Sequence, residues 1–208
     1  MKDPIVQAGA KVLSQKAAPV LKKDIGGKAL DALIKKMKKA LAAEEFGVAI
    51  AAPQVGESLR MFVVGEKVFK KDTDEDELTA EHVSKKSSDL LASHGQTFLQ
   101  HVSPPHTVFI NPVLTRLSRK KKEMSEGCLS VRGTYGTVLR HEKATVEAWD
   151  EQGKPFVYHG SGLVAHIFQH ECDHLDGILY IDKALHVEED EDMDMKSARK
   201  KVKDKHGI

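Results

Sequence analysis

Residues 161–177 read SGLVAHIFQHECDHLDG and predict an α-helix that ends two residues before the glycine. Leu163, Ile167, His170 and His174 recur at helical spacing, so they share one face of this helix. A glycine just after the last residue of such a pattern is typical of a helix C-terminus. The stretch therefore combines apolar residues and two histidines on one helical face.

The pattern His-Glu-x-x-His lies within this helix and consists of His170, Glu171 and His174. At about 100° per residue, the two histidines are about 40° apart around the helix and one turn apart along it, so both imidazoles can reach one metal ion. Glu171 flanks that position, where its carboxylate can take a proton from a bound water. The pentapeptide also occurs by chance in unrelated proteins, so on its own it favours a metal site without proving one.

A catalytic metal site of this kind needs a third protein ligand and an open position for water. The best candidate is Cys128 in the segment EGCLS (residues 126–130), because a cysteine in a glycine-containing segment after a charged turn is well placed to present a thiolate. Cys172 is the poorer candidate. It follows His170 by two residues and points about 200° away from it, so we interpret it as a core thiol.

A third segment, GVAIAAPQ (residues 47–54), consists mostly of small residues that let other groups approach the backbone closely. Gln54 at its end offers an amide that can donate to a developing oxyanion. Taken alone, the segment is also compatible with a tight strand entry followed by a surface glutamine.

Around these segments the sequence predicts the α+β fold class, with strands in the middle and helices toward both ends. An amphipathic helix is predicted within Gly26–Glu45, where apolar residues fall on one face and lysines interleave with them. Asp150–Lys154 contains a glycine and predicts the turn of a β-hairpin. The predicted strands are Arg60–Val64, Thr107–Leu114, Thr145–Trp149 and Pro155–Tyr158.

The composition is that of a globular protein of 208 residues, 40% of them apolar, with a formal net charge of +1. This balance argues against a dedicated nucleic-acid-binding or acidic scaffold protein. No stretch approaches about 18 consecutive apolar residues and the start of the chain is charged, so neither a membrane span nor a secretory signal is expected. Two cysteines cannot form a disulfide framework, which favours free thiols in a reducing compartment. No phosphate-binding loop motif is present, so we expect no nucleotide cofactor.

Two charged segments stand apart from this pattern. Residues 66–106 lie between two predicted strands, include an acidic cluster, and are interpreted as an exposed insertion in a domain over residues 1–184. Residues 188–194 hold six acids in seven positions, and residues 196–205 hold six bases and one acid. We interpret residues 185–208 as a charged tail or helix, which is usually solvated but can also contact RNA phosphates.

In this order, the three motifs resemble those of the peptide deformylases, whose pattern is G-x-G-[LI]-A-A-x-Q, then E-G-C-L-S, then Q-H-E-x-D-H-L-x-G. The corresponding segments here are GVAIAAPQ (47–54), EGCLS (126–130) and QHECDHLDG (169–177), and the resemblance covers roughly residues 4–184. It implies antiparallel β-sheets packed around a central metal-binding helix that carries HExxH, with an amphipathic N-terminal helix and a charged C-terminal helix.

The resemblance also implies a role for each matching residue. Cys128, His170 and His174 are the implied metal ligands, and Glu171 is the implied general acid–base. Gln54 and the backbone N–H of Leu129 form the implied oxyanion hole. Arg140 and Asp173 form a buried structural pair, with Glu126 near it. The implied substrate contacts are the added-strand backbone and the walls of an apolar pocket for methionine: Gly47, Val48, Ala49, Gly127, Leu129, Leu163, His166 and Ile167.

The implied activity is that of a hydrolase that removes the N-formyl group from the formylmethionine of newly made polypeptides and releases formate. A water activated by one divalent metal ion attacks the formyl carbonyl, with Fe(II) expected in the cell and Zn, Ni or Co able to occupy the same site. The expected partners are formylmethionyl nascent peptides and, through the basic C-terminal segment, the ribosome. The expected compartment is the bacterial cytoplasm rather than an organelle.

Two other functions stay open at this point. An HExxH zinc endopeptidase would need a downstream third ligand, for which His186 and Glu188 are available, but it leaves EGCLS unexplained. A catalytically weak, ribosome-associated binding protein of the same fold would use the basic segments. The presence of all three metal ligands, Glu171 and Gln54 argues against that second alternative.

The chain departs from the family pattern at three positions and in the insertion. Ala49 stands in place of the second glycine of the first motif, and it would be strained if that position needed a positive φ. We expect that the position needs only a small residue. Ser14 replaces an arginine and is expected to affect packing only. His166 stands one turn before His170 in place of an aliphatic residue or arginine, and we interpret it as a pocket wall rather than a fourth ligand.

Overall fold

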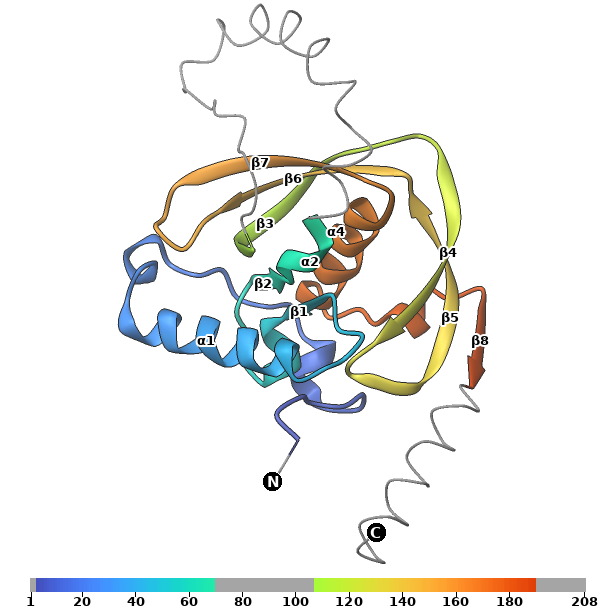
Figure 1. The fold of residues 1–208 in the computed structure, drawn as a ribbon, viewed down its shortest axis with the longest axis horizontal. Coiled ribbons are helices and arrows are strands. Elements are labelled where there is room, and N and C mark those ends of the chain that lie inside the picture. Colours follow the sequence, from blue (N-terminus) through green and yellow to red (C-terminus); the bar gives the residue numbers. More distant parts are fainter. Residues whose placement is uncertain (1–2, 70–106, 190–208) are drawn as a thin grey trace, which may run out of the picture.

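The computed structural model describes residues 3–69 and 107–189, which form two antiparallel β-sheets around a central helix, α4 (Gly162–Leu175). Figure 1 shows the strands wrapped around α4, and α1 (Lys28–Ala42) on the far side of β1 and β2 from it. The larger sheet has the order β1-β2-β3-β6-β7 and the smaller one β4-β5-β8. The strands are β1 (Ala49–Ala51), β2 (Met61–Val64), β3 (Val108–Leu117), β4 (Lys121–Cys128), β5 (Val131–His141), β6 (Lys143–Trp149), β7 (Pro155–Ser161) and β8 (His186–Glu189).

Short helical turns complete the described chain. The helix α2 (Glu66–Phe69) follows β2, and the 3₁₀ helices are η1 (Lys11–Ser14), η2 (Lys22–Asp24), η3 (Ala52–Val55) and η4 (Tyr180–Asp182). None of the helices in residues 3–69 and 107–189 has the length and apolar character that crossing a membrane requires. The mixed α and β class predicted from the sequence is confirmed.

The larger sheet is apolar on both faces because it is packed between two helices. Along β2, Met61 and Val63 lie in the core cluster beneath α1, whereas Phe62 and Val64 lie in the cluster around α4. The alternation follows from the period of two in a β-strand. Phe62 stacks on Phe109 of β3, with ring centroids 4.6 Å apart. The position of α4 is thus set by an aromatic core on one face of this sheet.

The predicted amphipathic helix is confirmed as α1. Its apolar stripe is buried against the sheet, and its lysines face outward. The buried residues are Leu30, Leu33, Ile34, Met37, Ala40 and Leu41.

Strand β3 links the two sheets, because the chain passes from it directly into β4 of the smaller sheet. Its pairing with β6 shifts register after Ile110 and again after Leu114. Asn111 lies at the first shift with φ 51, and its side-chain amide exchanges two hydrogen bonds of 2.8 Å with the backbone of Val20. Such bulges bend a strand and increase its twist. This bend helps carry the chain out of one sheet and into the other.

The helix α4, which carries the HExxH motif, ends in a Schellman motif. Gly177 has φ 76, its N–H donates to the carbonyl of His174, and the N–H of Ile178 donates to the carbonyl of Asp173. The glycine also packs tightly, since a Cβ placed there would lie 2.8 Å from the backbone carbonyl carbon of Ser14. The glycine predicted to end this helix therefore also allows η1 to pack against the helix end.

We expect Gly177→Ala to lower the free energy of unfolding by at least about 2 kcal/mol, because alanine would be strained at positive φ and would also collide with the backbone at Ser14. Urea denaturation measures the change. Gly9→Ala is the matched control, since Gly9 has φ 92 with open space around its Cβ position, and it should cost about 1 kcal/mol. Equal losses in the two variants would contradict a role for the close packing.

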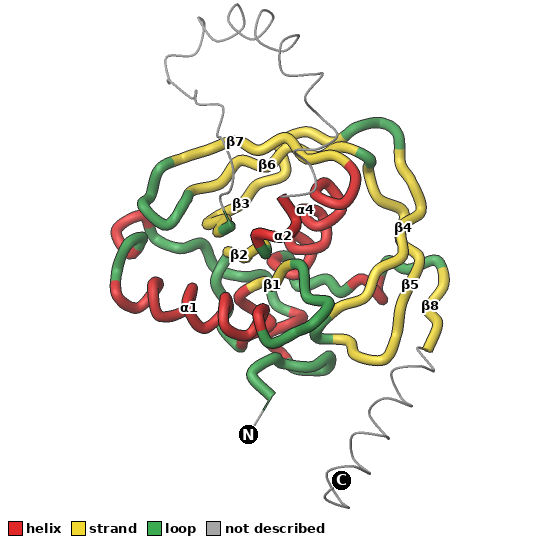
Figure 2. The backbone as a smooth tube through the Cα atoms, viewed as in Figure 1, coloured by secondary structure: helices red, strands yellow, loops and turns green. Residues whose placement is uncertain are grey.

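The structure corrects two boundaries of the sequence analysis. The segment from residue 185 was predicted to be a charged tail or helix, but His186–Glu189 forms β8 and pairs with Thr134–Thr137 of β5. The strand is exposed, so its pairing comes from backbone hydrogen bonds at an open sheet edge that composition does not reveal. Figure 2 shows the described chain ending in this strand.

The insertion was predicted to begin at residue 66, yet Val68 and Phe69 of α2 are buried in the core around α4. The acidic cluster after residue 70 and the basic segment 196–205 lie outside the described residues.

Candidate metal centre

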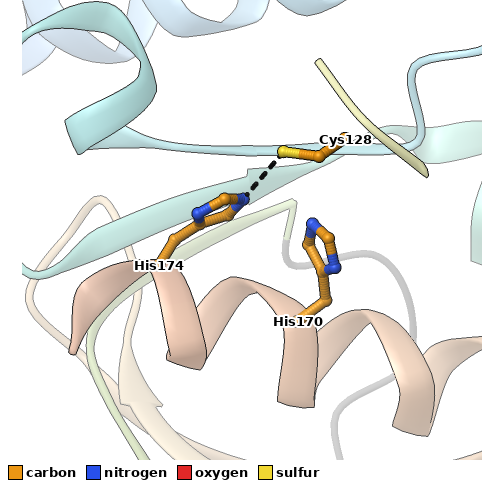
Figure 3. Close-up of side chains that lie close together, drawn as sticks. All are labelled: Cys128, His170 and His174. Atoms are coloured by element: carbon orange, nitrogen blue, oxygen red, sulfur yellow. Dashed lines mark hydrogen bonds between the residues drawn. The ribbon is translucent and has the colours of Figure 1, made fainter. Parts of the chain in front are cut away.

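Cys128, His170 and His174 come together at the centre of the molecule. Their ligand atoms all lie within 4.8 Å of one another, and Cys128 Sγ is 3.2 Å from Nε2 of His174. Figure 3 shows the two imidazoles on one side of α4, next to the side chain of Cys128. The three residues predicted to bind a metal are thus brought together by the fold.

Two local features of the chain place these side chains. The histidines share a helix face because they are four residues apart on α4. Cys128 ends β4 just after a register shift between Glu126 and Cys128 in the pairing with β5. Glu126 and Cys128 are two residues apart on β4, and residues at this spacing point to the same face of a strand. Both side chains can therefore contact histidines of α4.

The His170 ring is oriented by Glu126. Nδ1 of His170 lies 2.8 Å from Oε2 of Glu126, and Arg140 contacts both oxygens of the same carboxylate at 2.6 and 3.0 Å. Burial alone raises the pKa of Glu126, but hydrogen bonds from His166, His170 and Arg140 outweigh it and hold that pKa well below its usual range. An ionised carboxylate only accepts, so His170 donates from Nδ1. Its Nε2 lone pair is therefore left for a metal ion.

Arg140 links the smaller sheet to α4 by hydrogen bonds. It bonds Glu126 of β4 and, through Nη1 at 2.6 Å, the carboxylate of Asp173 on α4. Lys183 adds a second contact to Asp173 at 2.6 Å. The pair of Arg140 and Asp173 expected from the resemblance is thus present in the geometry, but only Arg140 is buried, whereas Asp173 is partly buried and also bonds Lys183.

The sulfur of Cys128 lies among hydrogen-bond donors. The backbone N–H of Ser130 and the side-chain amide of Gln54 each lie 3.4 Å from it. Burial raises the pKa of the Cys128 thiol to about 12, and the nearby Glu171 carboxylate adds to the effect. Coordination to a divalent cation deprotonates a thiol outright. The sulfur therefore needs a bound cation to become charged, which is how a cysteine ligand behaves.

Gln54 has a fixed orientation. Its Oε1 accepts a 2.8 Å hydrogen bond from the backbone N–H of Ala51, so its NH₂ group must face Cys128 and Ser130. The residue is buried within η3. Gln54 therefore lies inside the molecule beside the metal ligands, which excludes the alternative of a surface glutamine.

Glu171 is buried next to the cluster of Cys128, His170 and His174, and one of its carboxylate oxygens makes no hydrogen bond to the described residues. Its Oε2 has no hydrogen-bond partner among the described residues. Burial raises the pKa of its carboxyl to about 8, and the charge on Glu126 contributes. A carboxyl with its pKa near neutrality can both take up and release a proton in this setting.

The donor set fits a divalent transition metal. Bonds of about 2.0–2.3 Å to nitrogen and sulfur place the ligands of one tetrahedral ion roughly 3–4 Å apart, close to the size of this cluster. Burial lowers the pKa of His174 well below its usual value, and the charge of the neighbouring His170 adds a smaller effect in the same direction. This imidazole is therefore held neutral. Thiolate and neutral imidazole suit iron(II) and zinc alike. With three protein ligands, a fourth position is left for water or substrate.

Some of the residues expected to contact substrate lie at or next to two sheet edges, and the others lie on α4. Among the described strands, β1 pairs only with β2 and β4 only with β5, so each has an edge to which an extended peptide could pair. Ala49 lies in β1 and is not among the described residues with positive φ, so alanine is not strained at this position. Gly127 packs beneath the Tyr135 ring, since a Cβ placed at this glycine would lie 2.7 Å from a ring carbon.

The side chains expected to form the apolar pocket differ in exposure. Leu163 is half exposed at the start of α4, Val48 is partly buried and Ile167 is buried in the core around α4. His166 is also buried, and its Nε2 contacts Glu126 at 2.7 Å. It does not belong to the ligand cluster of Cys128, His170 and His174, in agreement with the interpretation that it is not a fourth ligand.

Sequence reasoning missed several groups around the centre. Ser130 bonds the Gln54 amide at 3.3 Å, and Lys183 bonds Asp173. Tyr180 stacks on the His170 ring with centroids 6.4 Å apart, and its hydroxyl is anchored by Thr134. Cys172 is buried in the core, as predicted. The contact of Ser130 with Gln54 joins residues 76 positions apart, whereas Tyr180 and Lys183 each lie ten positions after their partner on α4, beyond the reach of helical spacing.

Comparison with sequence families gives a match to the family described as polypeptide deformylase over residues 2–190. The chain is 38% identical over 182 residues to peptide deformylase 1A of Arabidopsis thaliana, a chloroplastic/mitochondrial protein, covering 87% of this chain and 61% of that protein. It is 33% identical over 177 residues to peptide deformylase 1 of Nitrosomonas europaea, covering 85% of this chain and 84% of that protein. The chain thus spans less than two thirds of the plant relative and most of the bacterial one.

Comparison with solved structures also finds similarity to peptide deformylases. The chain resembles a Met-Ala-Ser-bound class I type b peptide deformylase of Acinetobacter baumannii with a TM-score of 0.64 and 27% identity, over 86% of this chain and 96% of that one. It resembles an actinonin complex of a peptide deformylase from Synechococcus elongatus with a TM-score of 0.66 and 28% identity, over 89% and 82% of the two chains.

Proposed function

The chain belongs to the polypeptide deformylase family, and on this premise we propose that it is a hydrolase that removes the formyl group from the N-terminal formylmethionine of newly made polypeptides. The observation that carries the proposal is the cluster of Cys128, His170 and His174 with Glu171 buried beside it. The bound Met-Ala-Ser in the Acinetobacter relative supports a methionyl peptide as the product class. The products are formate and a peptide with a free N-terminal methionine.

The proposed mechanism divides the work among the residues around the cluster. Cys128, His170 and His174 would hold the divalent ion, which would supply Lewis-acid chemistry by lowering the pKa of a water toward neutrality. Glu171 accepts the proton of the attacking water and passes it to the leaving amine. The Gln54 amide and the backbone N–H of Leu129 donate to the oxygen on which negative charge develops. Buried surroundings strengthen each of these interactions.

We propose that the peptide binds as an added strand, with backbone contacts from Gly47, Val48, Ala49, Gly127 and Leu129. The two open sheet edges at β1 and β4 support this mode, because edge strands present unpaired N–H and C=O groups. Leu163 and Ile167, with Val48, are proposed to form the apolar wall for the methionine side chain. The Cys/His/His set accepts iron and zinc alike, and the metal is proposed to be Fe(II) in the cell because the family resemblance implies iron.

We place the protein in a reducing compartment, because the ligand Cys128 must remain a thiol to bind the metal. A bacterial cytoplasm meets this requirement. The relatives include bacterial and chloroplastic/mitochondrial proteins, so the family itself occurs in both settings.

The geometry weighs against the endopeptidase alternative. His186 and Glu188, the downstream candidates for its third ligand, are exposed on β8, where they pair with Thr137 and Tyr135 of β5. Neither belongs to the ligand cluster found among the described residues. The proximity of Cys128 to both histidines supports Cys128 as the third ligand instead.

The direct test is formate release from formyl-Met-Ala-Ser by anaerobically purified protein supplied with Fe(II) or Ni(II). Rapid release that stops on chelation and returns with metal is the expected result. A metal-loaded protein that releases no formate would contradict the proposal and favour the weakly catalytic binding protein. Cleavage of an internal peptide bond instead would favour the endopeptidase.

We expect Gln54→Ala to lower kcat by about 100- to 1000-fold, because it removes one donor to the developing oxyanion. KM should change little, since this donor acts mainly in the transition state. Ser130→Ala is the control: it removes the other partner of the Gln54 amide at 3.3 Å but leaves the amide itself, and it should cost less than about tenfold. A loss of similar size in both variants would indicate that Gln54 acts only by joining the two segments.

We also propose ribosome binding through the basic segment 196–205, whose net charge of six bases and one acid suits RNA phosphates. Removing residues 196–208 is expected to weaken cosedimentation with ribosomes at low salt and to leave the turnover of a short formyl peptide unchanged. Unchanged ribosome affinity in the truncated protein would contradict this contact.

A further inference from the structure

We propose that His166 is a positioning residue for the metal centre, which fixes the Glu126 carboxylate that in turn orients His170. The inference rests on the metal centre of the proposed function and adds to it a residue that the sequence had indicated only as a pocket wall. It assigns no ligand role to His166. The experiment that tests the proposal measures metal binding separately from deformylation.

The geometry at Glu126 carries the proposal. Oε1 of Glu126 lies 2.7 Å from Nε2 of His166 and 2.6 Å from Nε of Arg140. Oε2 lies 2.8 Å from Nδ1 of His170 and 3.0 Å from Nη2 of Arg140. An ionised carboxylate has about four lone-pair sites, so these four donors saturate it.

The direction of the His166 hydrogen bond follows from its surroundings. An ionised carboxylate cannot donate, so Nε2 of His166 carries the proton. Nδ1 of His166 is buried and has no hydrogen-bond partner in the described part of the chain, so a proton there would be a buried donor without an acceptor. The geometry therefore fits a neutral imidazole with its single N–H directed at Glu126.

His166 and His170 attach Glu126 to α4 at two points one turn apart. Glu126 comes from β4 and Arg140 from β5, so both belong to the smaller sheet. Without His166, the carboxylate would keep its two bonds to Arg140 but would touch α4 only through His170. It could then pivot about the arginine, and the orientation of the His170 ring would be less well defined.

This contact distinguishes His166 from a residue that only lines a pocket. The side chain is about nine-tenths buried, and its N–H is used in the bond to a carboxylate that is almost fully buried. A wall residue would affect the fit of the methionine side chain. A residue that holds Glu126 would affect the metal ion, because groups that orient a ligand typically change metal affinity by about 10- to 100-fold.

The test compares three substitutions. His166→Leu removes the donor, His166→Gln places an amide N–H at nearly the reach of the imidazole Nε2, and His166→Asn is polar but too short to reach Glu126. The affinity for Zn²⁺, measured by competition with a chelator, is expected to fall about tenfold for Leu and Asn, at the lower end of the usual range because Arg140 remains. His166→Gln should restore it to within about threefold. The visible absorption of the Co²⁺-loaded protein should change in the same two variants and return toward wild type in the Gln variant.

His159→Leu is the matched control, because this histidine bonds Thr145 on the β6–β7 hairpin, outside the centre. It should leave Zn²⁺ affinity and the Co²⁺ spectrum unchanged. Circular dichroism checks that each variant is folded. If His166→Leu does not fold, the comparison of His166→Asn with His166→Gln tests the proposal without it. Wild-type Zn²⁺ affinity in the Leu or Asn variant, a Gln variant as weak as the Asn variant, or a change confined to KM for formyl-Met-Ala-Ser would each overturn the proposal. Absence of deformylation in wild type, with the Zn²⁺ results as expected, would contradict only the proposed function.

Discussion

Glu171→Gln should retain the metal and lose nearly all turnover, with kcat about 10³- to 10⁴-fold lower. The substitution keeps the size and shape of a buried side chain whose Oε2 has no partner among the described residues, so the fold should tolerate it. The amide cannot accept the proton of the attacking water or deliver it to the amine, and proton transfer of this kind typically contributes about 10²–10⁴ in rate. Formate release and metal content on the same preparation measure the two effects.

Glu123→Gln is the matched control for this experiment. Glu123 lies exposed on the same strand, β4, as the cysteine ligand, and the change is chemically identical. It should leave both turnover and metal content at wild-type levels. A metal-loaded Glu171→Gln protein with more than a tenth of wild-type activity would show that another group moves the proton.

The second large effect is expected for Cys128→Ala, which should weaken metal binding by about 100- to 1000-fold. Structural zinc sites with four ligands bind with about 10–16 kcal/mol, which is roughly 2.5–4 kcal/mol for each ligand. Since about 1.4 kcal/mol corresponds to tenfold in affinity, loss of the sulfur gives this range. Activity at limiting metal should fall in parallel. Chelator competition measures the affinity.

The protein supplies its own control in the other cysteine. Cys172 lies on α4 next to Glu171 but is buried in the core on the other side of the helix from the ligands. Cys172→Ala should lower the free energy of unfolding by about 1 kcal/mol and leave the metal affinity unchanged. Similar metal affinity in the two alanine variants would rule out Cys128 as a ligand.

The parts of the site that the sequence predicted are those governed by local periodicity. His170, Glu171 and His174 are fixed relative to one another by 3.6 residues per turn, so their geometry follows from spacing alone. The apolar stripe of α1 was predicted for the same reason. Cys128 and Gln54 were candidates from their own segments, and the resemblance gave them roles, but their proximity depends on how two distant segments meet.

What the sequence could not predict depends on register and on long-range packing. The register shift between Glu126 and Cys128 is a property of the pairing of β4 with β5, so no local sequence pattern reveals it. The contact of His166 with Glu126 joins residues 40 positions apart, and nothing near either residue signals it. Strand β8 was missed because a short, charged and exposed segment resembles a solvated tail, and only the open edge of β5 gives it a partner.

The distribution of the ligands over the fold has a consequence for thermal behaviour. Cys128 belongs to the smaller sheet, whereas His170 and His174 belong to the helix packed on the larger one, so a bound ion acts as a cross-link between the two layers. Ion binding to the native state raises the unfolding free energy by about 2.7 kcal/mol when free metal exceeds its Kd 100-fold. The melting temperature should therefore rise with free metal concentration. Under metal starvation, amide hydrogen exchange should increase first along the seam between β4 and α4.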